Sequence, residues 1–152
     1  MTTAKGIADS FYPVAQAFCY GIESLCIKEP VQYERIIAQL MQIYLAALQL
    51  PDVEPDTTYT AQKECHTASA KFGNLNLYWE VFNPYEQTEP VARLLTDDIF
   101  SIREDLSGGC RLYEMGFIND ALWQWRFDFR SHWSFHAADA IRAINQIIMD
   151  GP

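Results

Sequence analysis

Hydrophobic residues recur every three or four positions along most of the chain, which is the spacing of a helix with one buried face. In the first such segment Ser10 is expected to cap the helix, Pro13 falls in its first turn, and Lys28–Pro30 close it. A second segment runs over Val31–Leu50, and Pro51 ends it. The pattern therefore predicts two helices in the first third of the chain, followed by a loop.

The middle of the chain is less regular. Apolar residues at seven-residue spacing predict a helix over Ala61–Phe72, but Gly73, Asn74 and Asn76 interrupt the pattern. For residues 73–82 the sequence does not decide between a helix and an extended segment.

Two longer helices are predicted in the C-terminal half. The first has Pro90 in its first turn, keeps helical spacing for six turns and ends at Gly116. The pair Gly108-Gly109 inside it implies either a weak point in the helix or the close approach of another segment. The last helix is capped by Asn119 or Asp120 and reaches about Met149.

Together these segments predict an all-α protein, an antiparallel bundle of about five helices that forms a single domain over residues 1–152. Strands that alternate with helices, as in an α/β sheet, are not expected. The chain is 49% hydrophobic, and a chain of this length can bury a core without disulfides or metals.

Charge and composition narrow the classes of partner. Asp and Glu number 20 against 11 Lys and Arg, which argues against binding to nucleic acid or to an anionic membrane. No apolar run reaches the roughly 20 residues that span a bilayer, and the first residues lack the apolar core of a signal peptide. We therefore expect a cytoplasmic protein. The cysteines lack Cys-x-x-Cys spacing and are expected to be free thiols: Cys19, Cys26, Cys65 and Cys110.

Polar residues on the two C-terminal helices form a candidate metal site. On the last helix, His132 and His136 are four residues apart, on a strip that borders the apolar face. On the preceding helix, Asp98 and Asp105 are two turns apart at the edge of the apolar face. If the two strips meet, imidazoles and carboxylates would offer ligands to a divalent metal such as zinc, iron or manganese. The predicted ligands are Asp98, Asp105, His132 and His136, with Asp128 and Asp139 as alternates.

A structural ion-pair network is the competing interpretation of the same residues. Arg126 falls inside the aromatic stripe of the last helix, and Arg130 lies at its edge. A buried arginine needs a carboxylate partner, which Asp98 and Asp105 could supply. The sequence favours this network over a metal site.

Two aromatic residues of the last helix, Trp123 and Phe127, point away from its main apolar stripe. We expect them to pack on the loop Pro84–Pro90, because large apolar patches are rare on monomers. The alternative is a surface patch that binds a partner.

The C-terminal half also resembles a known family. The motifs that carry the resemblance are the segments 95–99, 103–109, 123–129 and 132–136. They resemble the bacterial family catalogued as domain of unknown function 5063, over about Tyr78–Ile147, although that family has Gly where this chain has Ser134. The resemblance implies an all-helical bacterial protein and brings no reaction and no ligand.

Three functions follow as hypotheses. The favoured one is a structural or protein-interaction module, with a protein partner or as a homo-oligomer. The second is a metal-binding protein, with a hydrolytic reaction as one use of the metal. The third is a nucleotide pyrophosphohydrolase-like enzyme, which ranks last because Glu-x-x-Glu pairs for Mg²⁺ are absent.

Overall fold

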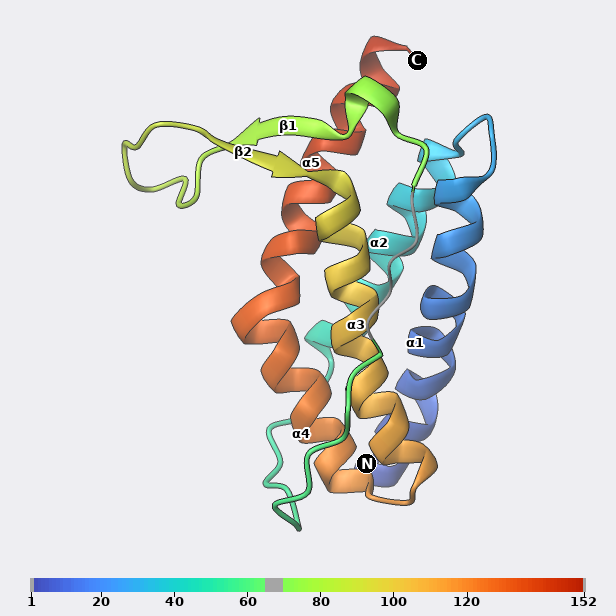
Figure 1. Ribbon diagram of the computed structural model, residues 1–152. Coiled ribbons are helices and arrows are strands. Elements are labelled where there is room, and N and C mark those ends of the chain that lie inside the picture. Colours follow the sequence, from blue (N-terminus) through green and yellow to red (C-terminus); the bar gives the residue numbers. More distant parts are fainter. Residues whose placement is uncertain (1, 65–69, 152) are drawn as a thin grey trace.

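A computed structural model describes residues 2–64 and 70–151, and it shows a bundle of long helices with a small hairpin at one side (Figure 1). The helices are α1 (Ala4–Ile27), α2 (Tyr33–Leu48), α3 (Leu95–Glu114), α4 (Ile118–Asp128) and α5 (Ser134–Asp150). The shorter elements are the 3₁₀ turn η1 (Gly73–Leu75), the strands β1 (Leu77–Glu80) and β2 (Val91–Leu94), and the π-helical segment η2 (Phe129–Trp133). Because α4, η2 and α5 follow one another without a break, the described part of the chain forms four long rods. The prediction of a mostly helical single-domain bundle is confirmed.

The first helix begins earlier than the sequence pattern predicts. Thr3 is its N-cap, and the Thr3 side chain accepts a hydrogen bond of 3.0 Å from the backbone N–H of Gly6. Ser10, the predicted cap, lies inside α1, where its hydroxyl donates to the carbonyl of Gly6 at 3.0 Å. Pro13 likewise lies inside the helix. The prediction was wrong because Thr3, a second residue that can cap a helix, lies about two helical turns before Ser10.

The predicted third helix is not formed by those of its residues that are described. Residues 61–64 and 70–72 are irregular, and the rest of the predicted helix lies outside the described residues. Ala61 and Phe72 are nevertheless buried in the core. Their spacing therefore reflects two separate contacts of a connecting segment with the bundle.

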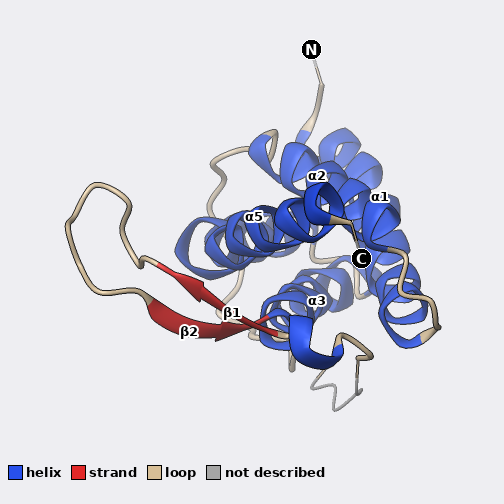
Figure 2. Ribbon diagram, turned by 90° about the horizontal axis from the view of Figure 1, so that it is seen from above, coloured by secondary structure: helices blue, strands red, loops and turns tan. Residues whose placement is uncertain are grey.

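An antiparallel hairpin replaces the predicted first turn of the fourth helix. Leu77 pairs with Leu94 and Glu80 with Val91, so Pro90 precedes a strand and α3 begins only at Leu95. Of the two alternatives left open for residues 73–82, the extended one is thus correct for Leu77–Glu80, which form β1. Viewed from above, the hairpin and the loop that joins its strands project sideways from the helices (Figure 2).

The last rod also starts two or three residues earlier than the sequence pattern predicts. Helix α4 begins at Ile118, and neither predicted cap residue caps it with its side chain. Asp120 is buried instead and accepts a hydrogen bond of 2.7 Å from the backbone N–H of Asp56. This contact holds the connecting segment 51–64 against the end of the rod.

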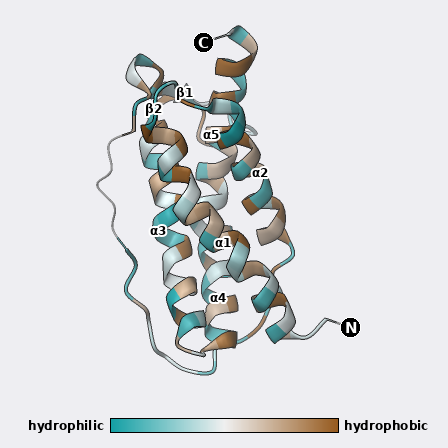
Figure 3. Ribbon diagram, turned by 90° about the vertical axis from the view of Figure 1, so that its right-hand side faces the viewer, coloured by the Kyte–Doolittle hydropathy of each residue, from teal (hydrophilic) through white to brown (hydrophobic). Residues whose placement is uncertain are grey.

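The core lies between the rods, and hydrophobic and hydrophilic positions alternate along each of them (Figure 3). Trp125 is fully buried, and its indole N–H donates to the carbonyl of Leu106 at 3.2 Å. The indole lies where a side chain of Gly109 would be, because a Cβ at that position would come within 2.3 Å of it. Close approach of another element, rather than a weak helix, thus explains this glycine.

The cysteines of the described residues are free thiols that pack in or against the core: Cys19, Cys26 and Cys110. Burial raises the pKa of Cys26 to about 12, so this thiol stays protonated at neutral pH. The fourth, Cys65, lies outside the described residues. In the part of the chain that the structure describes, no helix is long and apolar enough to cross a bilayer.

Candidate functional site

The two polar strips predicted on the C-terminal helices meet between α3 and the rod that contains η2 and α5. Asp98 Oδ1 lies 2.8 Å from Nδ1 of His136, and Asp105 Oδ2 lies 2.6 Å from Nδ1 of His132. The structure therefore brings all four predicted residues together as two Asp–His pairs.

The two imidazole rings approach each other at their free edges. The Nε2 atoms of His132 and His136 are 3.1 Å apart, and the rings are nearly perpendicular, with an interplanar angle of 80°. The side chain of His132 is 53% exposed and that of His136 is 15% exposed. The paired nitrogens thus lie where solvent and ions can reach them.

The carboxylates lie behind the rings and not beside the Nε2 atoms. Each Asp contacts Nδ1, on the opposite side of the ring from the Nε2–Nε2 contact. The four residues consequently do not surround one ion position as the sequence predicts. Within the described residues, no three His, Cys, Asp or Glu side chains are gathered so that they could hold one metal ion.

The local backbone helps to place His132. It belongs to η2, which contains one more residue per turn than an α-helix and interrupts the rod between α4 and α5. Phe129 and Trp133, from the same segment, remain buried in the core. The π-helical turn therefore anchors one side of the rod in the core while His132 faces outward. Such single π-helical turns are frequent at functional sites.

Side chains from outside the helices, two cations and one hydroxyl, hold the carboxylates of Asp98 and Asp105. Arg93, from β2, places a guanidinium nitrogen 3.0 Å from Asp98 Oδ1, and the hydroxyl of Tyr78, from β1, donates to Asp98 Oδ2. Lys63, from the connecting segment, lies 3.0 Å from Asp105 Oδ1. Asp98 is fully buried, so these partners compensate for the loss of its water shell.

The ion-pair network exists, but its predicted cations were wrong. Arg126 forms its ion pair with Asp52 at 3.3 Å, and Arg130 has no ion-pair or hydrogen-bond partner among the described residues. Lys63, Arg93 and Tyr78 were missed because no helical spacing links them to Asp98 or Asp105. The one sign of such partners is that Asp98 and Asp105 are buried, because a buried carboxylate needs a cation or a hydrogen-bond donor beside it.

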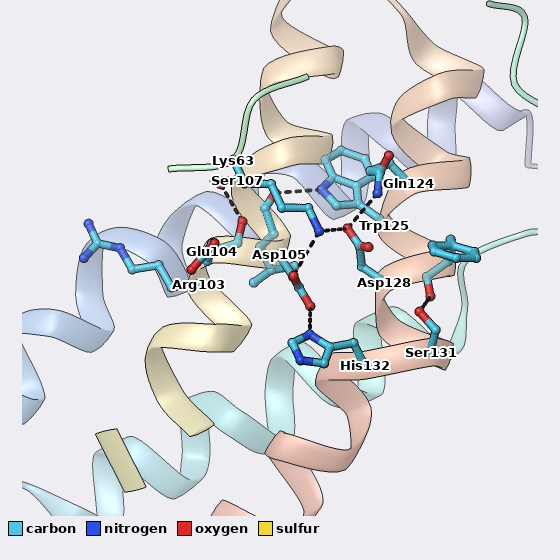
Figure 4. Close-up of polar contacts among 12 residues, drawn as sticks. Lys63, Arg103, Glu104, Asp105, Ser107, Gln124, Trp125, Asp128, Ser131 and His132 are labelled. Carbon is cyan, nitrogen blue, oxygen red and sulfur yellow. Dashed lines mark hydrogen bonds and ion pairs between the residues drawn. The ribbon is translucent and has the colours of Figure 1, made fainter. Parts of the chain in front are cut away.

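Asp128 and Asp139, the alternate metal ligands predicted from the sequence, lie at opposite ends of the network. Asp128 accepts from the Gln124 side chain at 2.9 Å and lies 3.1 Å from Lys63, which bridges it to Asp105 (Figure 4). Burial is the main cause that raises the pKa of Asp128. Asp139 lies 3.8 Å from Arg93, and burial together with the charge of Glu80 raises its pKa to about 6.

The charges of this network do not balance. Among the described residues, the network contains four carboxylates but only two permanent cations, Lys63 and Arg93. The carboxylates are those of Asp98, Asp105, Asp128 and Asp139. With both imidazoles neutral, negative charge is in excess around the rings. A cation or an added proton at the histidines would reduce the excess.

The predicted packing of Trp123 and Phe127 is also wrong. Their rings stack on each other with centroids 4.9 Å apart, beside Asp52 and Val53, and Phe127 is 51% exposed. The loop that was expected to cover them projects from the hairpin instead (Figure 2).

These features define the class of the protein: a small helical bundle with two Asp–His pairs between its C-terminal helices. The chain belongs to the family described as Domain of unknown function (DUF5063), whose profile matches residues 2–150. The resemblance noted for the C-terminal half is confirmed and extends over nearly the whole chain.

One solved structure shows the same fold. The crystal structure of protein BF1032 from Bacteroides fragilis superposes with a TM-score of 0.70, covering 90% of this chain and 89% of that chain. The two sequences are 19% identical, so the likeness concerns the fold alone. No curated protein matches the chain.

Proposed function

We propose that the protein binds one divalent transition-metal ion through the Nε2 atoms of His132 and His136. The observation that carries the proposal is the 3.1 Å separation of these two nitrogens, with a carboxylate on the other nitrogen of each ring. Asp98 and Asp105 act as positioning residues in this proposal, and water fills the remaining coordination positions.

The separation agrees with the geometry of a shared ion. Two nitrogens that each bind zinc at about 2.0–2.1 Å lie roughly 2.9–3.4 Å apart, from octahedral to tetrahedral angles. The Nε2–Nε2 distance of 3.1 Å falls within this range. The rings would therefore need little movement to accept the ion.

The hydrogen bonds to the carboxylates favour the required tautomer. A carboxylate oxygen can only accept, so each Nδ1 carries the hydrogen that it donates to Asp98 or Asp105. The Nη2 atom of Arg93 also lies 3.1 Å from Nδ1 of His136, but in this assignment it donates to Asp98 Oδ1 and not to the ring. Both Nε2 atoms are then left with lone pairs, which repel each other at 3.1 Å unless a cation or a proton lies between them.

The chemistry of the donors indicates which metals fit. Metal-binding histidines commonly donate their second ring nitrogen to a carboxylate, as both do here. Imidazole donors suit zinc, copper, nickel and iron, whereas manganese prefers oxygen ligands. Zinc and iron are therefore favoured over manganese among the metals expected from the sequence. The excess of negative charge around the rings supports binding of a divalent cation.

Calorimetric titration with ZnCl₂ tests the proposal. The wild-type protein, freed of metal with a chelator, is expected to bind one zinc ion per chain. His132→Ala and His136→Ala are each expected to abolish this binding, because one imidazole alone is a weak site. Asp98→Asn should weaken zinc binding by about 10–100-fold, the usual effect of removing the partner of a metal-bound histidine.

Asp97→Asn provides the matched control. Asp97 is adjacent to Asp98 on α3 but exposed, so the same change of residue type should leave zinc affinity unchanged. The proposal fails if the wild type binds no zinc, or if the two histidine variants bind it as well as the wild type does.

The interaction role predicted from the sequence does not depend on this site. Nucleotide hydrolysis gains no support, because Asp98 and Asp105 are engaged by Arg93, Tyr78 and Lys63 and are not open to Mg²⁺.

A further inference from the structure

An exposed groove, here called the aromatic groove, runs along α4 and η2. Its cavity volume is about 260 Å³. Trp123 and Phe127 stack within it at an interplanar angle of 10°, so they present a rigid apolar surface. The lining residues are Asp52, Val53, Trp123, Arg126, Phe127, Arg130 and Ser131.

The aromatic groove is locally basic in an acidic protein. It contains two arginines and one carboxylate, whereas the whole chain carries a net charge of −9. Asp52 pairs with Arg126, while the exposed Arg130 has no partner among the described residues. A ligand that combines an aromatic ring with negative charge would complement this surface.

The loop between the two strands has those properties. This loop, residues 81–90 and here called the hairpin tip, holds Phe82 at 82% and Tyr85 at 97% exposure. Glu86 and Glu89 are exposed beside them. Figures 1 and 2 show the hairpin tip extending away from the bundle.

Hydrogen bonds hold the hairpin tip in a defined turn. The side-chain oxygen of Asn83 accepts from the backbone N–H of Tyr85 at 3.0 Å, and its carbonyl accepts from the backbone N–H of Glu86 at 3.0 Å. A turn that is already formed loses less conformational entropy on binding than a flexible loop does. The hairpin tip is thus suited to insert into a groove.

We propose that the hairpin tip of one copy of this protein binds in the aromatic groove of a second copy. The tip supplies aromatic rings and glutamates, and the groove supplies stacked aromatics and an unpaired arginine. Within one molecule the two surfaces lie apart, so each remains exposed unless another copy covers it. Because the two surfaces differ, the contact is head-to-tail, and it generates rings or open chains rather than a two-fold dimer.

Sedimentation velocity over a wide range of protein concentrations tests this contact. The wild type is expected to associate as concentration rises. Arg130→Glu, which reverses charge in the groove, and the double variant Glu86→Arg/Glu89→Arg, which reverses it in the tip, should each raise the dissociation constant about tenfold or more. All of these positions are exposed, so the variants should keep the wild-type melting temperature.

Mixing the two variants gives the sharpest outcome. Arg130→Glu keeps an intact hairpin tip, and Glu86→Arg/Glu89→Arg keeps an intact aromatic groove. In the mixture the intact tip of the first variant can bind the intact groove of the second. Unlike chains in the mixture should therefore pair through one unaltered contact, with about the wild-type dissociation constant for that contact, whereas neither variant alone should do so. Leu45→Ala, which removes an exposed apolar side chain from α2, should leave association unchanged. A monomeric wild type, a mixture that fails to associate, or a loss of association in Leu45→Ala would overturn the proposal.

Discussion

At the scale of single residues, burial and charge determine what each polar group can do. Each carboxylate of α3 contacts both a cation and the Nδ1 atom of an imidazole, so it fixes a histidine ring without competing for the Nε2 edge. Asp139 differs, because its nearest cation is 3.8 Å away and Glu80 adds negative charge. Its raised pKa is a direct consequence.

The titration of Asp139 makes the stability of the protein depend on pH. Its pKa is about 6 in the folded protein against an ordinary value of 3.8, so the folded state holds the proton more tightly. This group's contribution to stability is therefore present at low pH and lost as pH rises towards and through about 6. Asn cannot ionise, so Asp139→Asn avoids the stability that is lost when the carboxyl becomes charged. The variant should therefore be more stable than the wild type at pH about 7.5, by on the order of 1–3 kcal/mol.

Urea unfolding at several pH values, in the presence of a chelator, measures the effect. The advantage of Asp139→Asn should shrink steadily as the pH falls towards about 4. An advantage that does not change with pH, or a variant less stable than the wild type at neutral pH, would contradict this explanation.

At the scale of elements, helical spacing was enough to predict the rods and the two polar strips on them. His132, His136, Asp98 and Asp105 could be placed because residues four or seven apart share a helical face. Arg93 could not be placed, since its position depends on a strand pairing that joins residues far apart in the sequence. The same holds for Lys63, which lies on an irregular segment. Sequence periodicity therefore predicted the histidines and carboxylates of the site but not the cations that hold them.

The packing of α4 on α3 leaves no room for a side chain at Gly109. Gly109→Ala would place a Cβ within 2.3 Å of the Trp125 indole, and either the rod or the ring must then move. We expect a loss of about 2–3 kcal/mol in unfolding free energy, as for overpacked cores, together with weakening of the hydrogen bond to Leu106. Chemical denaturation of the purified variants measures the loss.

Gly108→Ala is the matched control for this prediction. A Cβ at Gly108 would meet the flexible Lys63 side chain at 3.3 Å, so it should cost little, and the higher helix propensity of Ala should offset the cost. Equal stability changes in the two variants would show that the indole does not determine the requirement for glycine.

At the scale of the whole molecule, three separate parts of the chain converge on the histidine pair. The two C-terminal rods supply the rings and carboxylates, the hairpin supplies Arg93 and Tyr78, and the connecting segment supplies Lys63. On the other side of the last rod, the aromatic groove and the distant hairpin tip offer complementary surfaces for a second copy. Ion binding and association thus use different residues, so each can be tested without disturbing the other.

Anomalous diffraction from crystals soaked in zinc would show whether His132 and His136 share one metal ion. We predict one anomalous peak at the zinc edge, about 2.0–2.1 Å from both Nε2 atoms, with Asp98 and Asp105 still bound to the Nδ1 atoms. No peak between the two rings at saturating zinc, or a peak bound by the carboxylates instead, would contradict the claim.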